Sequence, residues 1–286
     1  MKQVGLVSTM GTVVSLDVRT PARPEVLAEA VEAVTTRLRA IDELFSAWRP
    51  DSWVSRLISG DVSPLDCPTE VQRVVAVAME LMESTDGYFS PFWRRLPYGD
   101  PGPDPTGLLK GWAAQQASDV LVSRGLPDHV VNAAGDIVVS GHPAPTDPAI
   151  PWRIGISDPH VARALVGVLA LDQKASRWAV ATSGTAELGA HVSDPHTGRF
   201  PRSLASATAV TRLHGIEEGA AVADACATAL VGAGESAPAL LEKLTGLGVE
   251  ALLIESGGSV RDPHQLLCSA TGFGRRLIRH HLPMLA

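Results

Sequence analysis

The chain has 286 residues, 45% of them hydrophobic and 19% charged, so it is long enough to bury a sizeable core and has the composition of an ordinary globular protein. Its formal net charge of −7, with no basic cluster before Arg275 and Arg276, argues against nucleic acid as a partner. Three cysteines that lie far apart fit neither a disulfide framework nor a zinc site and favour a reducing compartment.

No window approaches 18 consecutive apolar residues, so we expect no membrane span. Gly, Ser and Thr interrupt the apolar run at the N-terminus, and no cleavage site of small residues follows it. We therefore expect a cytoplasmic protein.

The first 45 residues predict two strands and a helix. Residues 4–7 and 13–18 are typical of strands on either side of an elbow of Ser, Thr, Met and Gly. Met10 in this elbow offers either a soft apolar surface to a ligand or simply a core side chain. Apolar residues recur at helical spacing from 24 to 45 and predict an amphipathic helix that packs on the core.

Two tryptophans and two arginines follow within residues 45–57. Either they form a ring stack with polar edges for a ligand, or the segment is a turn between helices whose tryptophans fill the core. Residues 69–82 predict a second amphipathic helix, capped by Thr69 and followed by a turn that carries residues 88–90.

The stretch from 104 to 141 has the clearest turn and helix-boundary signals in the chain. It predicts a Gly-anchored turn, a helix that begins near Lys110, a strand at 129–131 and a polar elbow at 132–136. A loop with glycine and lysine ahead of a helix suits phosphate, because backbone N–H groups and an ammonium converge where the helix dipole favours negative charge. The alternative is a plain helix N-terminus with a solvated lysine. The segment is neither a Walker loop nor a GxGxxG fingerprint.

The second half of the chain predicts further strands and a polar turn. Residues 152–157, 166–171 and 178–182 are typical of strands in a meander. In the segment HVSDPHTG, Asp194 is placed to bond its own downstream backbone in a turn. His191 at the start of that segment is either a base or a surface histidine.

Asp224 and Thr228 are four residues apart, so on a helix they share one face. A carboxylate and a hydroxyl are hard oxygen ligands suited to Mg²⁺, which takes few protein ligands and lets phosphates complete its octahedron. The alternative is that Asp224 caps a helix and Thr228 packs in its first turn.

Eight short phrases occur in one order: MGT, FSAWRPDSWVSRL, TDGYFSP, GLLKGWAA, VNAAGD, ATSG, HVSDPHTG and ADACATAL. Together they resemble the ApbE-like family, the FAD:protein FMN transferases. The strand-rich segments interleaved with helices predict an α+β fold. The resemblance implies an ApbE-like (T-fold-like) architecture, with mainly antiparallel sheets and flanking helices in two related lobes. It also implies a single domain over residues 1–286, with FAD between the lobes.

The resemblance implies a magnesium-dependent enzyme that transfers FMN from FAD to a threonine hydroxyl of an acceptor flavoprotein and releases AMP. His191 becomes the candidate for handling the acceptor's proton, with Asp194 beside the reacting centre. The family's metal ligands correspond to the side chains of Asp224 and Thr228 and the backbone carbonyls of Ser118 and Ala227. The family's FAD contacts correspond to Met10, Trp48, Tyr88, Phe89, Ser90, Lys110, Gly111, Gln115, Leu121 and Ser193.

Three positions depart from the family pattern. Gln115 and Ser90 stand where the family has aspartate, and Ala134 replaces a glycine in the polar elbow. The first two changes remove negative charge near the proposed ligand. Two alternatives to the transferase therefore stay open: a hydrolase that splits FAD into FMN and AMP with water, and a non-catalytic protein that binds or stores FAD.

Overall fold

The structure is a computed structural model that describes residues 3–95, 99, 102–147, 149–171, 177–184, 192–213 and 218–268. Its α-helices are α1 (Pro24–Phe45), α2 (Trp53–Ser59), α3 (Thr69–Ser84), α4 (Leu109–Ser123), α5 (Gly219–Ala233) and α6 (Ala237–Thr245). Short 3-10 turns lie at Pro64–Asp66, Trp93–Arg95, Thr106–Leu108 and Gly234–Ser236. The strands are β1 (Gln3–Thr9), β2 (Thr12–Val18), β3 (His129–Ala133), β4 (Asp136–Ser140), β5 (Trp152–Ser157), β6 (Leu165–Leu171), β7 (Arg177–Gly184), β8 (Leu204–Arg212), β9 (Glu250–Glu255) and β10 (Val260–Arg261).

One large sheet forms the centre of the fold. Among the described residues its strands run in the order β1-β2-β3-β4-β7-β8-β9-β10, and all neighbours are antiparallel. Helices α1 to α4 connect β2 to β3, and α5 with α6 connects β8 to β9, so each half repeats one strand–strand–helix–strand–strand order. The β4–β7 pairing joins the halves. This arrangement confirms the expected α+β fold with antiparallel sheet and two related lobes.

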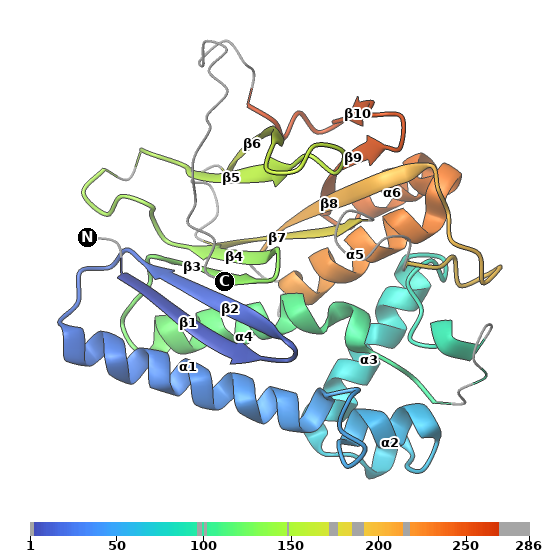
Figure 1. Ribbon diagram of the computed structural model, residues 1–286, viewed down its shortest axis with the longest axis horizontal. Coiled ribbons are helices and arrows are strands. Elements are labelled where there is room, and N and C mark those ends of the chain that lie inside the picture. The colour runs from blue at the N-terminus through green and yellow to red at the C-terminus, as the bar shows by residue number, and fades with distance from the viewer. Residues whose placement is uncertain are drawn as a thin grey trace.

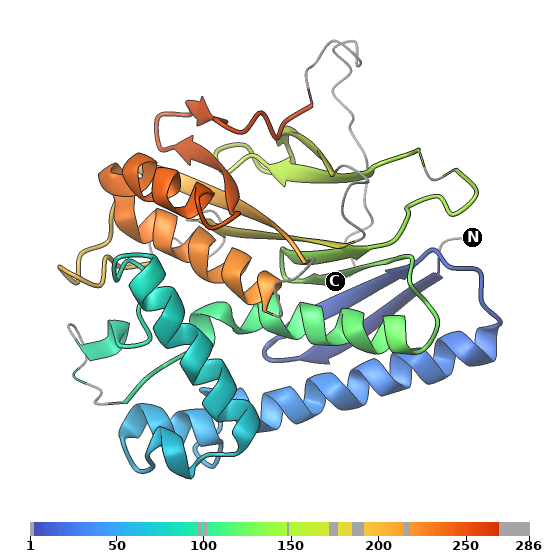
Figure 2. The ribbon, with the colours of Figure 1, turned by 180° about the vertical axis from the view of Figure 1, so that it is seen from behind.

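The layers on the two faces of the sheet differ, as Figures 1 and 2 show. Helices α4 and α5 cover one face, and α1 packs against α4 and β1. The hairpin β5–β6 lies over the other face and buries Trp152, Ile154 and Ile156 against residues of β7 such as Val180. The molecule therefore has two cores, one on each side of the sheet. No helix in the described ranges is both long enough and apolar enough to cross a membrane.

The structure differs from the expected elements in three places. The helix α3 begins at Thr69, but Pro68 holds its N-cap position and no side chain caps it, so the predicted Thr69 cap is wrong. Residues 53–59 form α2, a helix that the sequence did not predict, capped by the Ser52 hydroxyl. The strands β5 and β6 form a sheet of their own instead of a meander with β7, because their apolar side chains pack onto the face opposite the helices.

His129, at the start of β3, is fully buried and hydrogen-bonded through both ring nitrogens. Its Nδ1–H donates to Leu126 O (2.7 Å), so Nε2 accepts from Ser118 Oγ (2.7 Å). Arg177 in turn donates to Ser118 Oγ (2.8 Å). Burial lowers the pKa of His129 to about 4, and the Arg177 charge acts in the same direction, whereas the bond to Leu126 O opposes both. The fold therefore holds this imidazole neutral.

We predict that protonation of His129 destabilises the fold. Its pKa is about 4 in the folded protein and about 6.5 in an unfolded chain, so its stabilising contribution is present above pH 6.5 and is lost as the pH falls to 4. The shift corresponds to about 3 kcal/mol of unfolding free energy. Urea unfolding at pH 7 and pH 4, compared between the unsubstituted chain and His129→Gln, isolates this contribution. The exposed His160 provides the control variant His160→Gln, and equal pH dependence in both variants would contradict the prediction.

Candidate active site

The helices α4 and α5 come from opposite halves of the sheet and cap each other. Neither has a side-chain cap from its own N-cap residue. Asp224 of α5 accepts a hydrogen bond from Gly111 N (2.9 Å), near the start of α4. Gln115 of α4 accepts one from Ala220 N (2.9 Å), near the start of α5. Each helix thus supplies a side-chain oxygen that accepts a hydrogen bond from the first turn of the other helix. The backbone N–H groups of a first turn have no acceptor within their own helix.

The contact between the two helices depends on the absence of a side chain at Gly111. A Cβ there would lie 2.2 Å from Ala220 O and 2.8 Å from Asp224 Cβ. Asp224 lies in the second turn of α5, which begins at Gly219, so the alternative that Asp224 is an N-cap is wrong. Thr228 follows one turn later on the same helix face.

Two carboxyl groups and one ammonium lie close together around Asp224. This side chain is 4% exposed, and burial raises its pKa to about 8. The charge of Asp136 raises it too, whereas the Lys110 ammonium and the N–H groups of Gly111 and Lys110 lower it. Lys110 Nζ lies 2.7 Å from Asp136 Oδ2, in an ion pair that joins α4 to β4. A bound cation would lower the pKa of Asp224 and let both carboxyl groups ionise, so the arrangement suits a cation.

A cavity of about 330 Å³, here called the first cavity, opens at this contact. Aromatic rings, side-chain oxygens and one ammonium line it together, which suits a ligand that combines planar rings with phosphate. Its lining residues are Tyr88, Phe89, Ser90, Trp93, Asp104, Thr106, Gly107, Lys110, Ser183, Val192, Ser193, Pro195, Asp224 and Thr228.

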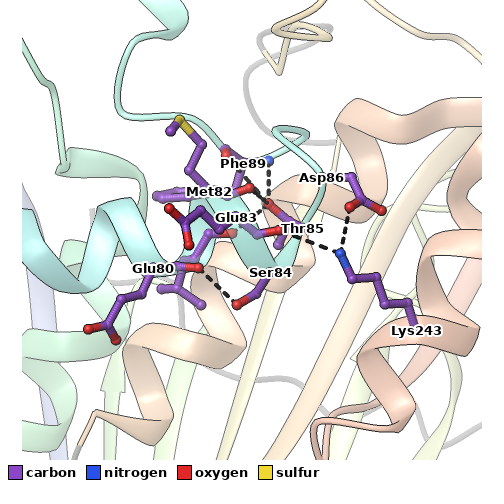
Figure 3. A network of polar contacts seen from close by, with 9 residues as sticks. Glu80, Met82, Glu83, Ser84, Thr85, Asp86, Phe89 and Lys243 are labelled. Carbon is purple, nitrogen blue, oxygen red and sulfur yellow. Dashed lines mark hydrogen bonds and ion pairs between the residues drawn. The ribbon is translucent and has the colours of Figure 1, made fainter.

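The turn that carries residues 88–90 is fixed by Thr85 at the end of α3 (Figure 3). Thr85 Oγ1 donates to Leu81 O (2.7 Å) and accepts from Phe89 N (3.1 Å). Lys243 of α6 pairs with Asp86 (2.5 Å), which ties the turn to the other half of the molecule. Because Thr85 is fully buried, the aromatic wall of the first cavity is anchored to the core.

Asp104 is a lining residue that the sequence analysis did not single out. It is 1% exposed, and its carboxylate accepts from Arg94 Nε (2.7 Å) and from Thr106 N (2.9 Å) and Oγ1 (2.5 Å). An aspartate that bonds the backbone N–H two residues on is typical of an Asx-turn. The sequence Asp-Pro-Thr ahead of GLLKG was therefore a signal that could have identified it.

Ser183, at the end of β7, is a second lining residue that the sequence analysis did not assign to the site. Its Oγ lies 2.9 Å from Thr228 Oγ1. With Asp224, the cluster offers one carboxylate and two hydroxyls, all of them hard oxygen ligands. Within the described residues, no three His, Cys, Asp or Glu side chains gather closely enough to hold a metal. A metal ion here would therefore depend on hydroxyl, backbone, water or substrate oxygens as well.

A second cavity, of about 310 Å³, shares Lys110 and Ser183 with the first. It lies between the large sheet and the β5–β6 hairpin. Its remaining lining residues are Asn132, Ala134, Gly135, Ile137, Ile154, Gly155, Ile156, Ser157, Pro159, Val180, Thr182, Gly184 and Ser206.

A model of the ApbE family matches residues 10–97 and 103–261, which is most of the chain. The chain belongs to the ApbE family. A curated relative, the FAD:protein FMN transferase of Vibrio cholerae serotype O1 (strain ATCC 39541 / Classical Ogawa 395 / O395), is 28% identical over 136 residues. That match covers 45% of this ApbE chain and 37% of the relative, so it spans little more than a third of the relative's length.

Solved structures of ApbE proteins share the fold over most of their length. The ApbE protein of Thermotoga maritima has a TM-score of 0.74 at 21% identity, covering 92% of this chain and 97% of that one. The flavin transferase ApbE of Vibrio cholerae has a TM-score of 0.71 at 20% identity, covering 91% and 96%. The apo flavinyl transferase ApbE of Pseudomonas stutzeri has a TM-score of 0.71 at 21% identity, covering 94% and 98%.

The structure of this ApbE chain brings seven of the residues assigned from the family resemblance to the first cavity. These are Tyr88, Phe89, Ser90, Lys110, Ser193, Asp224 and Thr228. Gly111 adjoins them through its bond to Asp224. His191, the candidate base, lies outside the described residues.

Other assigned residues in α4 and α5 line neither cavity. Gln115 caps α5, Leu121 is fully buried in the core, and the Ser118 side chain bonds His129. Ser118 is also seven residues beyond Gly111, about 10 Å along the helix axis. Ala227 is buried within α5.

The remaining assigned residues lie in loops and also line neither of the two cavities. Met10 sits in the β1–β2 turn with a φ of 50° and packs on the core. Trp48 is 91% exposed, whereas Trp53 packs on the core. Asp194 bonds its own turn, through His196 N (2.9 Å) and Thr197 Oγ1 (2.8 Å), which confirms the predicted turn.

We predict that Gly111→Ala destabilises the protein by about 1–3 kcal/mol, because the new methyl group would force α4 and α5 apart. In an unconstrained helix the same change would stabilise by about 0.5–1 kcal/mol, so the sign of the effect is diagnostic. Urea unfolding monitored by circular dichroism measures it. Gly257→Ala is the matched control, since a Cβ there meets nothing within 4 Å. Equal midpoints for the two variants would show that the helices tolerate a methyl group at 111.

Proposed function

We propose that this chain transfers FMN from FAD to a threonine hydroxyl of an acceptor flavoprotein, releases AMP and uses Mg²⁺. The observation that carries the proposal is the convergence of Asp224, Thr228 and Lys110 on one cavity with an aromatic wall, in a chain of the ApbE family. The name of the Vibrio cholerae relative, FAD:protein FMN transferase, supports the same reaction.

The first cavity supports FAD as the donor. Lys110, in the first turn of α4, would meet the pyrophosphate where the helix dipole favours negative charge. Tyr88 and Phe89 offer apolar ring surface. At about 330 Å³, the cavity is at the small end of ligand pockets, which span about 300–1,000 Å³. FAD would therefore extend beyond it, and we propose that Met10 and Trp48 contact the part outside.

The donor set at Asp224 fits Mg²⁺. The carboxylate and the Thr228 hydroxyl are hard oxygens, and the buried Asp224 lies beside Asp136, whose carboxylate pairs with Lys110. We propose Asp224 and Thr228 as side-chain ligands, with the Ala227 carbonyl as a further candidate. The Ser118 carbonyl receives no support, because this residue lies about two helical turns from Gly111, the partner of Asp224. When bound, the ion would neutralise the phosphate oxygens during substitution.

The reaction is a substitution at the FMN phosphorus. The acceptor hydroxyl oxygen forms the new bond to phosphorus, the bridging bond to the AMP phosphate breaks, and the hydroxyl proton must leave. We propose that His191 takes this proton, with Asp194 shaping the turn that follows it. Both carboxylate oxygens of Asp194 accept hydrogen bonds within that turn. This engagement favours a positioning role for Asp194 over proton transfer.

Intact-protein mass spectrometry tests the proposal. A protein modified by the Vibrio cholerae transferase, prepared without flavin, would be incubated with this chain, FAD and Mg²⁺. A mass gain of one FMN unit, absent without metal, is the expected result. AMP release without a mass gain would replace the transferase with an FAD hydrolase. Intact FAD that stays bound would instead indicate a storage protein.

We predict that Asp224→Asn lowers the rate of FMN transfer at least about 100-fold, because the metal's contribution to phosphoryl chemistry is several kcal/mol. FAD affinity should change far less, since an amide oxygen can still accept from Gly111 N. Transfer rates and flavin fluorescence titrations give the two quantities. Asp61→Asn removes an exposed carboxylate that lines neither cavity and serves as the control. Full metal-dependent activity in Asp224→Asn would remove this residue from the metal site.

A further inference from the structure

The second cavity adjoins the first at Lys110 and Ser183 but is otherwise lined by different residues. Its apolar walls come from Ile137, Ile154 and Val180, and among the described residues that line it Lys110 alone is charged. A transfer reaction needs two ligands whose reacting atoms meet at one point. Two cavities that share a lysine and a serine provide such a meeting point, with the donor in the first and the second left for the acceptor.

One wall of the second cavity is the edge of a strand. The strand β5 pairs with β6 and, among the described residues, with no other strand. On the far side of β6, Val168 O accepts a hydrogen bond from Cys268 N (2.9 Å). In an antiparallel pair the N–H and C=O of one residue point to the same side, and successive residues alternate. The backbone N–H and C=O of Val168 therefore point away from β5.

This geometry fixes the direction of Gly155, the residue of β5 that is paired with Val168. Because the pair is not hydrogen-bonded, the N–H and C=O of Gly155 also point outward, away from β6. Gly155 lines the second cavity. A backbone donor and acceptor are thus presented at a strand edge beside the meeting point of the cavities.

We propose that the acceptor protein binds in the second cavity as an extended segment that adds a strand to the outer edge of β5. This inference rests on the proposed function. Strand addition recognises backbone and needs an exposed edge, which Gly155 provides. Ala134, Gly135 and Gly184 leave room on the opposite side for a polypeptide backbone. A hydroxyl side chain on the added strand would then reach Lys110 and Ser183, where the FMN phosphorus is expected.

The test compares Gly155→Pro with Gly155→Ala. Both variants carry a Cβ, which meets the flexible Leu165 side chain at 3.0 Å. Only proline removes the outward N–H and places ring atoms in the path of an added strand. That N–H makes no bond to β6, so the hairpin keeps its hydrogen bonds. The readout is the KM for the flavin-free Vibrio cholerae acceptor at saturating FAD and Mg²⁺, with the Kd for FAD measured by flavin fluorescence.

We expect the acceptor KM of Gly155→Pro to be at least about tenfold above that of Gly155→Ala, as the loss of one or two backbone hydrogen bonds would give. The Kd for FAD should be equal in the two variants. An equal Kd would also show that the first cavity is intact in both. Equal acceptor KM values would overturn the inference. A change in the Kd for FAD alone would overturn it too, and would place part of FAD in the second cavity. A lack of transfer by the unsubstituted chain would instead overturn the proposed function.

Discussion

The structure depends on a reciprocal contact between α4 and α5. Each helix lacks a cap from its own N-cap residue and receives one from the other, Asp224 for α4 and Gln115 for α5. Hydrogen bonds from backbone N–H groups to buried oxygens are costly to leave unmade, so the helices are held in one register. That register places a buried carboxylate at the start of α4, beside Lys110. The carboxyl group proposed to bind the metal therefore also holds the two helices together.

The same contact explains why Gln115 is compatible with this fold. The position requires an oxygen that accepts from Ala220 N, and an amide supplies one as a carboxylate would. The substitution removes a charge without removing the cap. Ser90 differs, because it lines the first cavity directly. Of the two departures that remove a negative charge, Ser90 is the one that changes the lining of the first cavity.

The two-fold repeat of the sheet explains why the site lies where it does. The β4–β7 pairing joins the halves, and each half contributes one of the capped helices. Lys110 and Asp136 come from the first half, whereas Ser183 and Asp224 come from the second. A site built at such a junction collects side chains from distant parts of the sequence, while the continuous sheet fixes their positions. Both cavities open on this junction and share residues from each half.

The sequence by itself determined the features that depend on residues close together in the chain. Helical spacing predicted α1 and the body of α3, the four-residue interval placed Asp224 and Thr228 on one helix face, and the order of eight phrases indicated the family. These signals are local because hydrogen bonds within helices and turns join residues close in the chain. The same locality explains why α2 was missed, since its seven residues are too few to establish a period.

Only the tertiary structure decided which residues line the first cavity. Three residues of α4 that are close in sequence to Lys110 face elsewhere. Gln115 caps α5, Ser118 bonds the buried His129, and Leu121 packs in the core. Asp104 and Ser183 carried weaker sequence signals but line the first cavity. The direction of each side chain follows from how α4 packs against α5 and the sheet. That packing joins residues about a hundred positions apart, and no local pattern in the sequence encodes it.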